Sequence, residues 1–329
     1  MRGGVEYGTL AVHVTVARRC ERRLRGATRG RLRDTWREER LEFLRPESWR
    51  EALEAKAAHP GARPIFGGTD LMVDLNFGRS RPESVMDLTR VPEIQGWEEE
   101  GGRLRIGAGV TYARIMAELR DRLPGLAMAS RTVGSPQIRN RGTVGGNLGT
   151  ASPAGDGLPP LYASGAQVEV ASIRGTRRIP VGEFIIGPKK NALEADELIS
   201  GFLIPEAGGP QQYSKIGPRN AMVIAVCSFG LALHPESRTV GACIGSAGPT
   251  PIQPREAEAF MEGVLAEGDL WESRAEIGDR ALARFGELSG MAAQPISDVR
   301  ASAEYRTHAV GVLARRSLSW AWDEYRNGR

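Results

Sequence analysis

Cysteine is scarce in this chain of 329 residues, which contains only Cys20, Cys227 and Cys243. Three cysteines so far apart cannot build a disulfide framework, and they cannot supply the four thiolates of an iron–sulfur cluster. A chain without disulfides suits a reducing compartment. We therefore expect a cytoplasmic protein.

Histidine and long apolar segments are also scarce. The four histidines stand far apart, at positions 13, 59, 234 and 308. This spacing indicates neither a metal cluster nor a Ser–His–Asp arrangement. No stretch approaches the roughly 18 consecutive apolar residues of a membrane span, so we expect no integral membrane protein.

The excess of positive over negative charge is confined to the first 40 residues. These residues include eleven arginines and five acidic residues, which gives a local charge of +6. Because the whole chain has a net charge of +4, the other 289 residues together have a charge of −2. The body of the protein therefore gives no electrostatic reason to expect nucleic acid as a partner.

Residues 1–40 themselves do not match a targeting signal. An apolar stretch at 9–17 precedes the arginines, the reverse of a secretory signal, and the five acids argue against an organelle transit peptide. We expect a disordered or spurious basic extension. A partner-binding arm and a targeting segment remain alternatives.

The globular pattern begins at residue 41 and predicts a small βαβ unit. Ser48 is suited to cap a helix, with Glu51 three residues later. A strand at 63–66, a glycine turn at 67–70, a helix at 71–77 and a strand at 84–88 follow. We then expect a strand at 104–108 and a helix at 112–119.

The second half of the chain predicts strands and then helices. The expected strands lie at 167–172, 178–180, 198–204, 221–233 and 239–246. From residue 253 onward Ala, Glu, Leu and Arg recur at helical spacing, and we place a domain boundary near residue 207.

Glycine is abundant, and two segments concentrate it: Phe66–Leu71, directly after a strand, and Arg141–Asp156. Paired glycines let the backbone approach a ligand closely, and successive N–H groups in such turns form an anion site. Either segment alone could be an ordinary turn. Together they favour a ligand with a pyrophosphate, such as a dinucleotide.

Other nucleotide-binding patterns are missing. The sequence has no G-x-x-x-x-G-K-[ST]. Gly107–Tyr112 begins like a Rossmann fingerprint, but Tyr112 stands where the third glycine belongs. We read it as a strand end and turn.

The two glycine segments resemble the FAD-binding medium subunit of molybdenum hydroxylases, the family of xanthine dehydrogenase and carbon monoxide dehydrogenase. The likeness runs in the right order from residue 41 to about residue 320. The segments that carry it are Phe66–Leu71, Gly134–Leu148, Ala151–Asp156, Tyr213–Arg219, Gly248–Pro251, Ser302–Arg306 and Leu313–Arg316.

The resemblance implies an α+β fold: a PCMH-type FAD-binding domain at 41–206, with lobes at about 41–105 and 106–206, and an α+β C-terminal domain at 207–329. It implies FAD as cofactor, contacted by residues of three kinds. Lys215 would lie near the flavin ring, and the stretch containing Ser152 and Asp156 would contact the sugar and ribityl chain. Backbone amides of the two glycine segments would hold the pyrophosphate. The residues of these segments are Phe66, Gly67, Gly68, Thr69, Asp70, Leu71, Thr143, Val144, Gly145, Gly146 and Asn147.

Several positions depart from the family pattern. Gly149-Thr150 stands where Cys-Asn is common, and Asn220 and Val223 replace residues that are often basic and acidic. The departures bear on flavin tuning rather than on FAD binding. From its own surroundings Lys215 could equally be a solvated strand lysine, while Cys227 and Cys243 fit apolar strands as inert core thiols.

The activity implied by the resemblance is oxidoreduction in a heteromer. A large subunit would carry the molybdenum cofactor and a small subunit the 2Fe-2S clusters. Electrons would pass from the clusters through FAD on this chain to NAD, oxygen or a quinone. The alternatives are an assembly subunit without turnover and a stand-alone flavoprotein oxidase, and the substrate (a purine, an aldehyde, carbon monoxide or another heterocycle) stays open.

Overall fold

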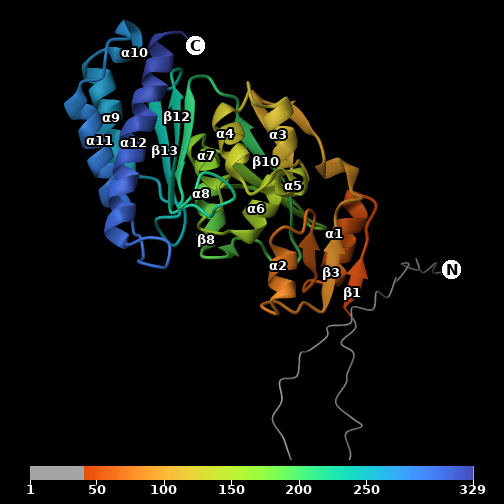
Figure 1. Cartoon of the computed structure of the whole chain (residues 1–329). Coiled ribbons are helices and arrows are strands. Elements are labelled where there is room, and N and C mark those ends of the chain that lie inside the picture. Colours follow the sequence, from red (N-terminus) through yellow and green to blue (C-terminus); the bar gives the residue numbers. More distant parts are fainter. Residues whose placement is uncertain (1–40, 329) are drawn as a thin grey trace, which may run out of the picture.

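The computed structural model describes residues 41–328. It is built around three sheets, each with its own apolar core. Figure 1 shows these parts in a row, from the small N-terminal sheet to a layer of long helices at the C-terminal end. The expectation for residues 1–40 falls outside the described part of the chain.

The N-terminal part is a three-stranded parallel sheet of order β1-β3-β2 with a helix before and after its edge strand β2. Its elements are β1 (Glu42–Leu44), α1 (Trp49–Ala58), β2 (Arg63–Ile65), α2 (Leu71–Asn76) and β3 (Ser84–Asp87). The predicted βαβ unit is confirmed, because β2, α2 and β3 follow the glycine turn in that order. Ser48 caps α1 as predicted, accepting the N–H of Glu51 at 3.2 Å.

The middle part contains a five-stranded antiparallel sheet of order β4-β5-β10-β6-β7. Its elements are η1 (Pro92–Ile94), β4 (Trp97–Glu100), β5 (Arg103–Gly107), α3 (Tyr112–Glu118), α4 (Pro124–Thr132), α5 (Pro136–Arg141), α6 (Val144–Thr150), α7 (Leu158–Ala163), β6 (Gln167–Ser172), β7 (Gly175–Pro180), α8 (Val181–Phe184), β8 (Ile185–Gly187), β9 (Lys190–Asn191) and β10 (Leu198–Pro205). The strand predicted at 167–172 is confirmed to the residue.

The C-terminal part is an antiparallel sheet of order β11-β12-β13 followed by helices. Its elements are β11 (Gln211–Ile216), β12 (Cys227–His234), β13 (Thr239–Gly245), α9 (Arg255–Glu267), α10 (Leu270–Ser273), α11 (Asp279–Ala292) and α12 (Ala303–Arg326). The sheet packs against α4 and α7 of the middle part and against α9 and α12 of its own part (Figure 1). The predicted α+β class is therefore confirmed.

Two sequence-based expectations were wrong. Residues 221–226 are an irregular loop and not the start of a strand, because Met222 has a φ of 49° and the Arg219 guanidinium binds the carbonyls of Ala221 and Met222. The second glycine segment, Arg141–Asp156, is not a turn throughout, since α6 covers seven of its sixteen residues. Within the described residues, no helix is both long and apolar enough to cross a membrane.

Candidate functional site

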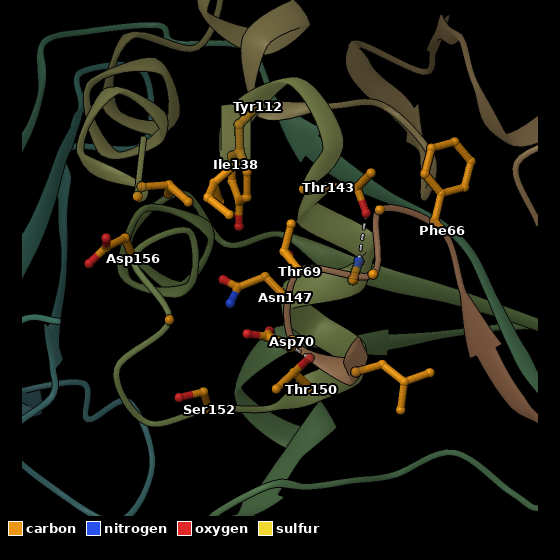
Figure 2. A pocket seen from close by; sticks show the side chains of 18 of the residues that line it. Phe66, Thr69, Asp70, Tyr112, Ile138, Thr143, Asn147, Thr150, Ser152 and Asp156 are labelled. Carbon is orange, nitrogen blue, oxygen red and sulfur yellow. Dashed lines mark hydrogen bonds between the residues drawn. The ribbon is translucent and has the colours of Figure 1, made fainter. Parts of the chain in front are cut away.

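A cavity of about 510 Å³ opens where the middle part meets the other two. Its walls come from the turn between β2 and α2, from α5 and α6, from the turn before α7, and from the loop after β11. In Figure 2, Phe66 and Asp156 lie at opposite sides of this space, with Thr69 and Asn147 between them. The sequence-predicted residues that line it are Phe66, Gly67, Gly68, Thr69, Asp70, Leu71, Thr143, Gly146, Asn147, Ser152 and Asp156.

The first glycine turn, residues 67–70, places backbone groups at the cavity wall. A Cβ on Gly67 would lie 2.0 Å from the carbonyl oxygen of Arg141, so the turn can press against the end of α5 only as glycine. Gly68 has a φ of 72°, which favours glycine. Among residues 41–328, no acceptor receives the N–H groups of residues 67–70. Four consecutive amide donors therefore remain available at this wall.

The second glycine segment supplies the first turn of α6. The Thr143 hydroxyl caps this helix, accepting the N–H of Gly146 at 2.8 Å (Figure 2). Val144 is buried in the core, and Gly145 packs on strand-end residue Ala108, where a Cβ would lie 2.5 Å from the Ala108 carbonyl oxygen. Val144 and Gly145 are thus the two predicted residues of this segment that do not line the cavity.

A hydroxyl–carboxylate contact ties the two glycine segments together. The Thr150 hydroxyl at the end of α6 donates to Asp70 at 3.0 Å. Asp70 is the residue before α2, and its side chain makes no capping bond to that helix. The contact therefore helps to fix the first glycine turn beside α6.

Asn147 carries a buried polar atom that lacks a partner. Its Oδ1 makes no hydrogen bond with any described residue. Gly155 packs against the amide so closely that a Cβ there would lie 2.6 Å from Asn147 Nδ2. Because buried polar atoms are almost always hydrogen-bonded, this oxygen at the cavity wall indicates a bound group with a donor.

Asp156 is held from behind by two residues of β11. Lys215 Nζ donates to its carboxylate at 2.6 Å, and the Tyr213 hydroxyl donates at 2.9 Å. Burial raises the pKa of Asp156 above its usual range, while Lys215, Tyr213 and Thr132 act in the opposite direction. Burial and the nearby Asp156 charge raise the pKa of Tyr213 far enough to keep it a protonated donor.

Lys215 does not line the cavity and is not a solvated lysine. Its side chain is only 8% exposed, and its ammonium also donates to the Thr132 carbonyl at 3.3 Å. Its charge is thus directed at Asp156.

A second cavity of about 650 Å³ lies on the other side of the first glycine turn. It is bounded by α1, α2, α6 and the segment between β8 and β10. The two cavities share residues of both glycine segments. The shared residues are Pro64, Ile65, Phe66, Asp70, Leu71, Thr143, Gly146 and Thr150.

Several lining residues were missed by the sequence analysis. Tyr112 reaches the cavity from α3, and Ile138 and Met222–Ile224 form part of its rim. Tyr112 was noted only as a mismatch to a Rossmann fingerprint. Ile138 lies within the segment Gly134–Leu148 and Val223 was noted as a departure from the family pattern, but neither was predicted to contact the cofactor. Their position in the folded chain places them at the cavity.

Comparison with known proteins gives two family matches. Residues 39–207 match the FAD binding domain in molybdopterin dehydrogenase. Residues 212–321 match the CO dehydrogenase flavoprotein C-terminal domain.

Individual relatives cover most of the chain. It is 34% identical over 239 residues to a nicotinate dehydrogenase FAD-subunit of Eubacterium barkeri, covering 68% of this chain and 80% of that protein. It is 31% identical over 286 residues to a nicotine 6-hydroxylase medium subunit of Paenarthrobacter nicotinovorans, covering 84% and 96%. A solved carbon monoxide dehydrogenase chain from Hydrogenophaga pseudoflava superposes with a TM-score of 0.78 at 26% identity, covering 86% and 98%.

Proposed function

This chain belongs to the FAD-binding subunit family of the molybdopterin dehydrogenases, and we propose that it is the electron-relay subunit of such an oxidoreductase. In this role it holds FAD across the two cavities. Electrons reach the flavin from 2Fe-2S clusters on a small partner subunit and leave to NAD, oxygen or a quinone. A large partner subunit carries the molybdenum cofactor and selects the substrate.

One observation carries the binding proposal: two cavities meet at a turn whose N–H groups have no acceptor among the described residues. FAD has the matching form, two ring systems joined by a pyrophosphate. Cavities of this size are typical of cofactor sites. Backbone N–H groups in a glycine turn can hold phosphate oxygens without a nearby lysine or arginine.

The residues present fit the cofactor. Amides of residues 67–70 would bind the pyrophosphate, with the first turn of α6 beside them. Asn147 Oδ1 would accept a hydrogen bond from a hydroxyl or ring N–H of FAD. Ser152 and Asp156 would bound the sugar and ribityl portion. Val144 would support the site from the core, and Gly145 lies at the wall of the second cavity.

The protein's share of the reaction is position and electrostatics. Bound FAD supplies the redox chemistry, converting between single electrons and electron pairs. The chain's own residues bind the cofactor and orient it. They also place a charged pair at the site, with Asp156 in the cavity wall and Lys215 behind it. We further propose that 41–206 and 207–329 are separate domains and that the helical layer α9–α12 is the docking surface for a partner subunit.

The binding proposal is tested by titrating flavin-free full-length chain with FAD, FMN and ADP. We expect FAD to bind tightly, ADP to compete with it, and FMN to bind more weakly because it leaves one cavity empty. The matched variant is Asn147→Leu, which removes the unpartnered oxygen and should weaken FAD binding. Failure of FAD to bind, or failure of ADP to compete, would contradict the two-cavity arrangement.

The relay itself needs a separate test, because an assembly subunit could also bind FAD. Affinity purification of the chain from its host should recover the two partner subunits. An NADH–dye reductase assay on the FAD-loaded chain and on the complex then separates a working relay from an inactive subunit. Flavin that stays oxidised in the complex under every reductant would overturn the relay.

A further inference from the structure

Asp156 stands at a boundary between two parts of the chain. It belongs to the turn between α6 and α7 and is 9% exposed. The residues that bind its carboxylate from behind, Tyr213 and Lys215, lie on β11 of the C-terminal sheet. The wall of the first cavity is therefore fastened to a different sheet.

Two side chains donate to this one carboxylate, and the hydroxyl of a third lies close to it. Lys215 Nζ lies 2.6 Å and Thr132 Oγ1 3.3 Å from Oδ2, and the Tyr213 hydroxyl lies 2.9 Å from Oδ1. Tyr213 and Lys215 do not line the cavity, whereas Asp156 does. Asp156 is therefore the lining residue through which the side chains of Tyr213 and Lys215 contact the cavity wall.

The charges around this cluster make the contacts mutually dependent. A buried carboxylate is costly unless it is paired, and removing one partner of such a pair costs more than removing both. The other titratable groups nearby are Tyr112 of α3, on which the Asp156 charge acts, and Asp70 of the glycine turn, whose charge also acts on Tyr112. Neither supplies a positive charge, so Lys215 is the sole cation of the cluster among the described residues.

We propose that Tyr213 and Lys215 are positioning residues that clamp Asp156, and with it the 152–156 wall, so that FAD affinity depends on β11 of the C-terminal sheet. This rests on the proposed FAD site. Lys215 therefore acts on the cofactor through Asp156 rather than as a free cation at the flavin ring.

The first test compares Tyr213→Phe with Tyr325→Phe, in flavin-free full-length chains titrated with FAD across pH. Tyr325 is the matched control because its hydroxyl also donates one hydrogen bond in the C-terminal part, a partly buried one to the Trp271 carbonyl at 2.9 Å, away from the cavity. Tyr213→Phe should raise the FAD dissociation constant about tenfold, a typical effect of losing a hydrogen bond to a charged group. Tyr325→Phe should leave it unchanged.

The pH profile separates clamping from a general loss of packing. The Tyr213 hydrogen bond lowers the pKa of Asp156, so its removal raises that pKa. The acid side of the affinity profile should then move to higher pH in Tyr213→Phe, and it should disappear in Asp156→Asn. A Tyr213→Phe profile that coincides with that of the unaltered chain would overturn the proposal.

The second test uses the charge pair. Lys215→Met leaves a buried carboxylate unpaired and should weaken FAD binding more than Tyr213→Phe does. Adding Asp156→Asn should recover part of the loss, because the double variant no longer buries a lone charge. A double variant that binds no better than Lys215→Met would contradict the clamp, whereas an unaltered chain that binds no FAD would contradict the proposed function instead.

Discussion

At the scale of single residues, Gly145 is constrained by the protein itself. From the sequence pattern, we attribute this glycine to a close approach of the backbone to phosphate. In the structure a Cβ on Gly145 would instead collide with the Ala108 backbone. Gly145→Ala should therefore lower the free energy of unfolding by about 1–3 kcal/mol, the usual cost of overpacking. Denaturant unfolding of the FAD-free chain measures this.

Gly149→Ala is the matched control in the same helix. The nearest atom to its added Cβ would be Ile199 Cδ1 at 3.6 Å, an ordinary contact. Alanine should be neutral or stabilise α6 by up to about 1 kcal/mol. Equal destabilisation by both substitutions would show that glycine is needed throughout α6 for another reason.

The two described cysteines should resist modification. Cys227 and Cys243 are fully buried, and burial raises the pKa of the Cys227 thiol to about 12 and that of Cys243 well above its usual range. Because only the thiolate reacts, iodoacetamide should label neither in the folded protein up to about pH 9 and both after denaturation. Peptide mass spectrometry measures the labelling, and rapid labelling of either cysteine in the folded chain would contradict this burial.

At the scale of elements, α6 depends on its cap. Thr143→Ala removes the hydroxyl that accepts the Gly146 N–H and should cost about 1 kcal/mol. Thermal unfolding should shift downward by about 1–2 °C, whereas Thr143→Ser keeps the hydroxyl and should shift much less. If both variants unfold at the same temperature, the hydroxyl does not stabilise α6.

Sequence patterns predicted elements best where local signals agree. Ser48 marked the start of α1 correctly, and the strand expected at 167–172 matched β6. The strand expected from 221 was wrong because apolar composition cannot reveal that the Arg219 guanidinium folds back onto the carbonyls that follow it. Likewise, the glycine content of Arg141–Asp156 suggested a turn, whereas Val144–Thr150 within it form α6.

The site was predictable only in part, because local sequence patterns do not reveal which distant segments come together in the folded chain. Motif residues such as Gly67 and Asn147 stand within recognisable segments, and the structure brings them to one cavity. Tyr112 and Met222 reach that cavity from other segments. The pairing of Lys215 with Asp156 joins residues 59 positions apart, and no local pattern specifies it.

At the scale of the whole molecule, both cavities are built by a limited span of the chain. Their lining residues fall between Lys56 and Ile224. A chain that begins at residue 41 should therefore retain the FAD content of the full chain, measured by flavin absorbance per protein. Loss of flavin on this truncation would assign residues 1–40 a part in binding.

The strand order also determines when the five-stranded sheet can form during synthesis of the chain. β10 lies between β5 and β6, and Gly201 of β10 pairs with Gly107 of β5, more than ninety positions earlier. During synthesis the first βαβ unit can form early. β5 can pair with β10 only after the ribosome has synthesised and released residues 198–205. Such distant pairing slows folding and leaves strand edges open meanwhile, so a nascent chain stalled before residue 198 would be exposed to aggregation and chaperone capture.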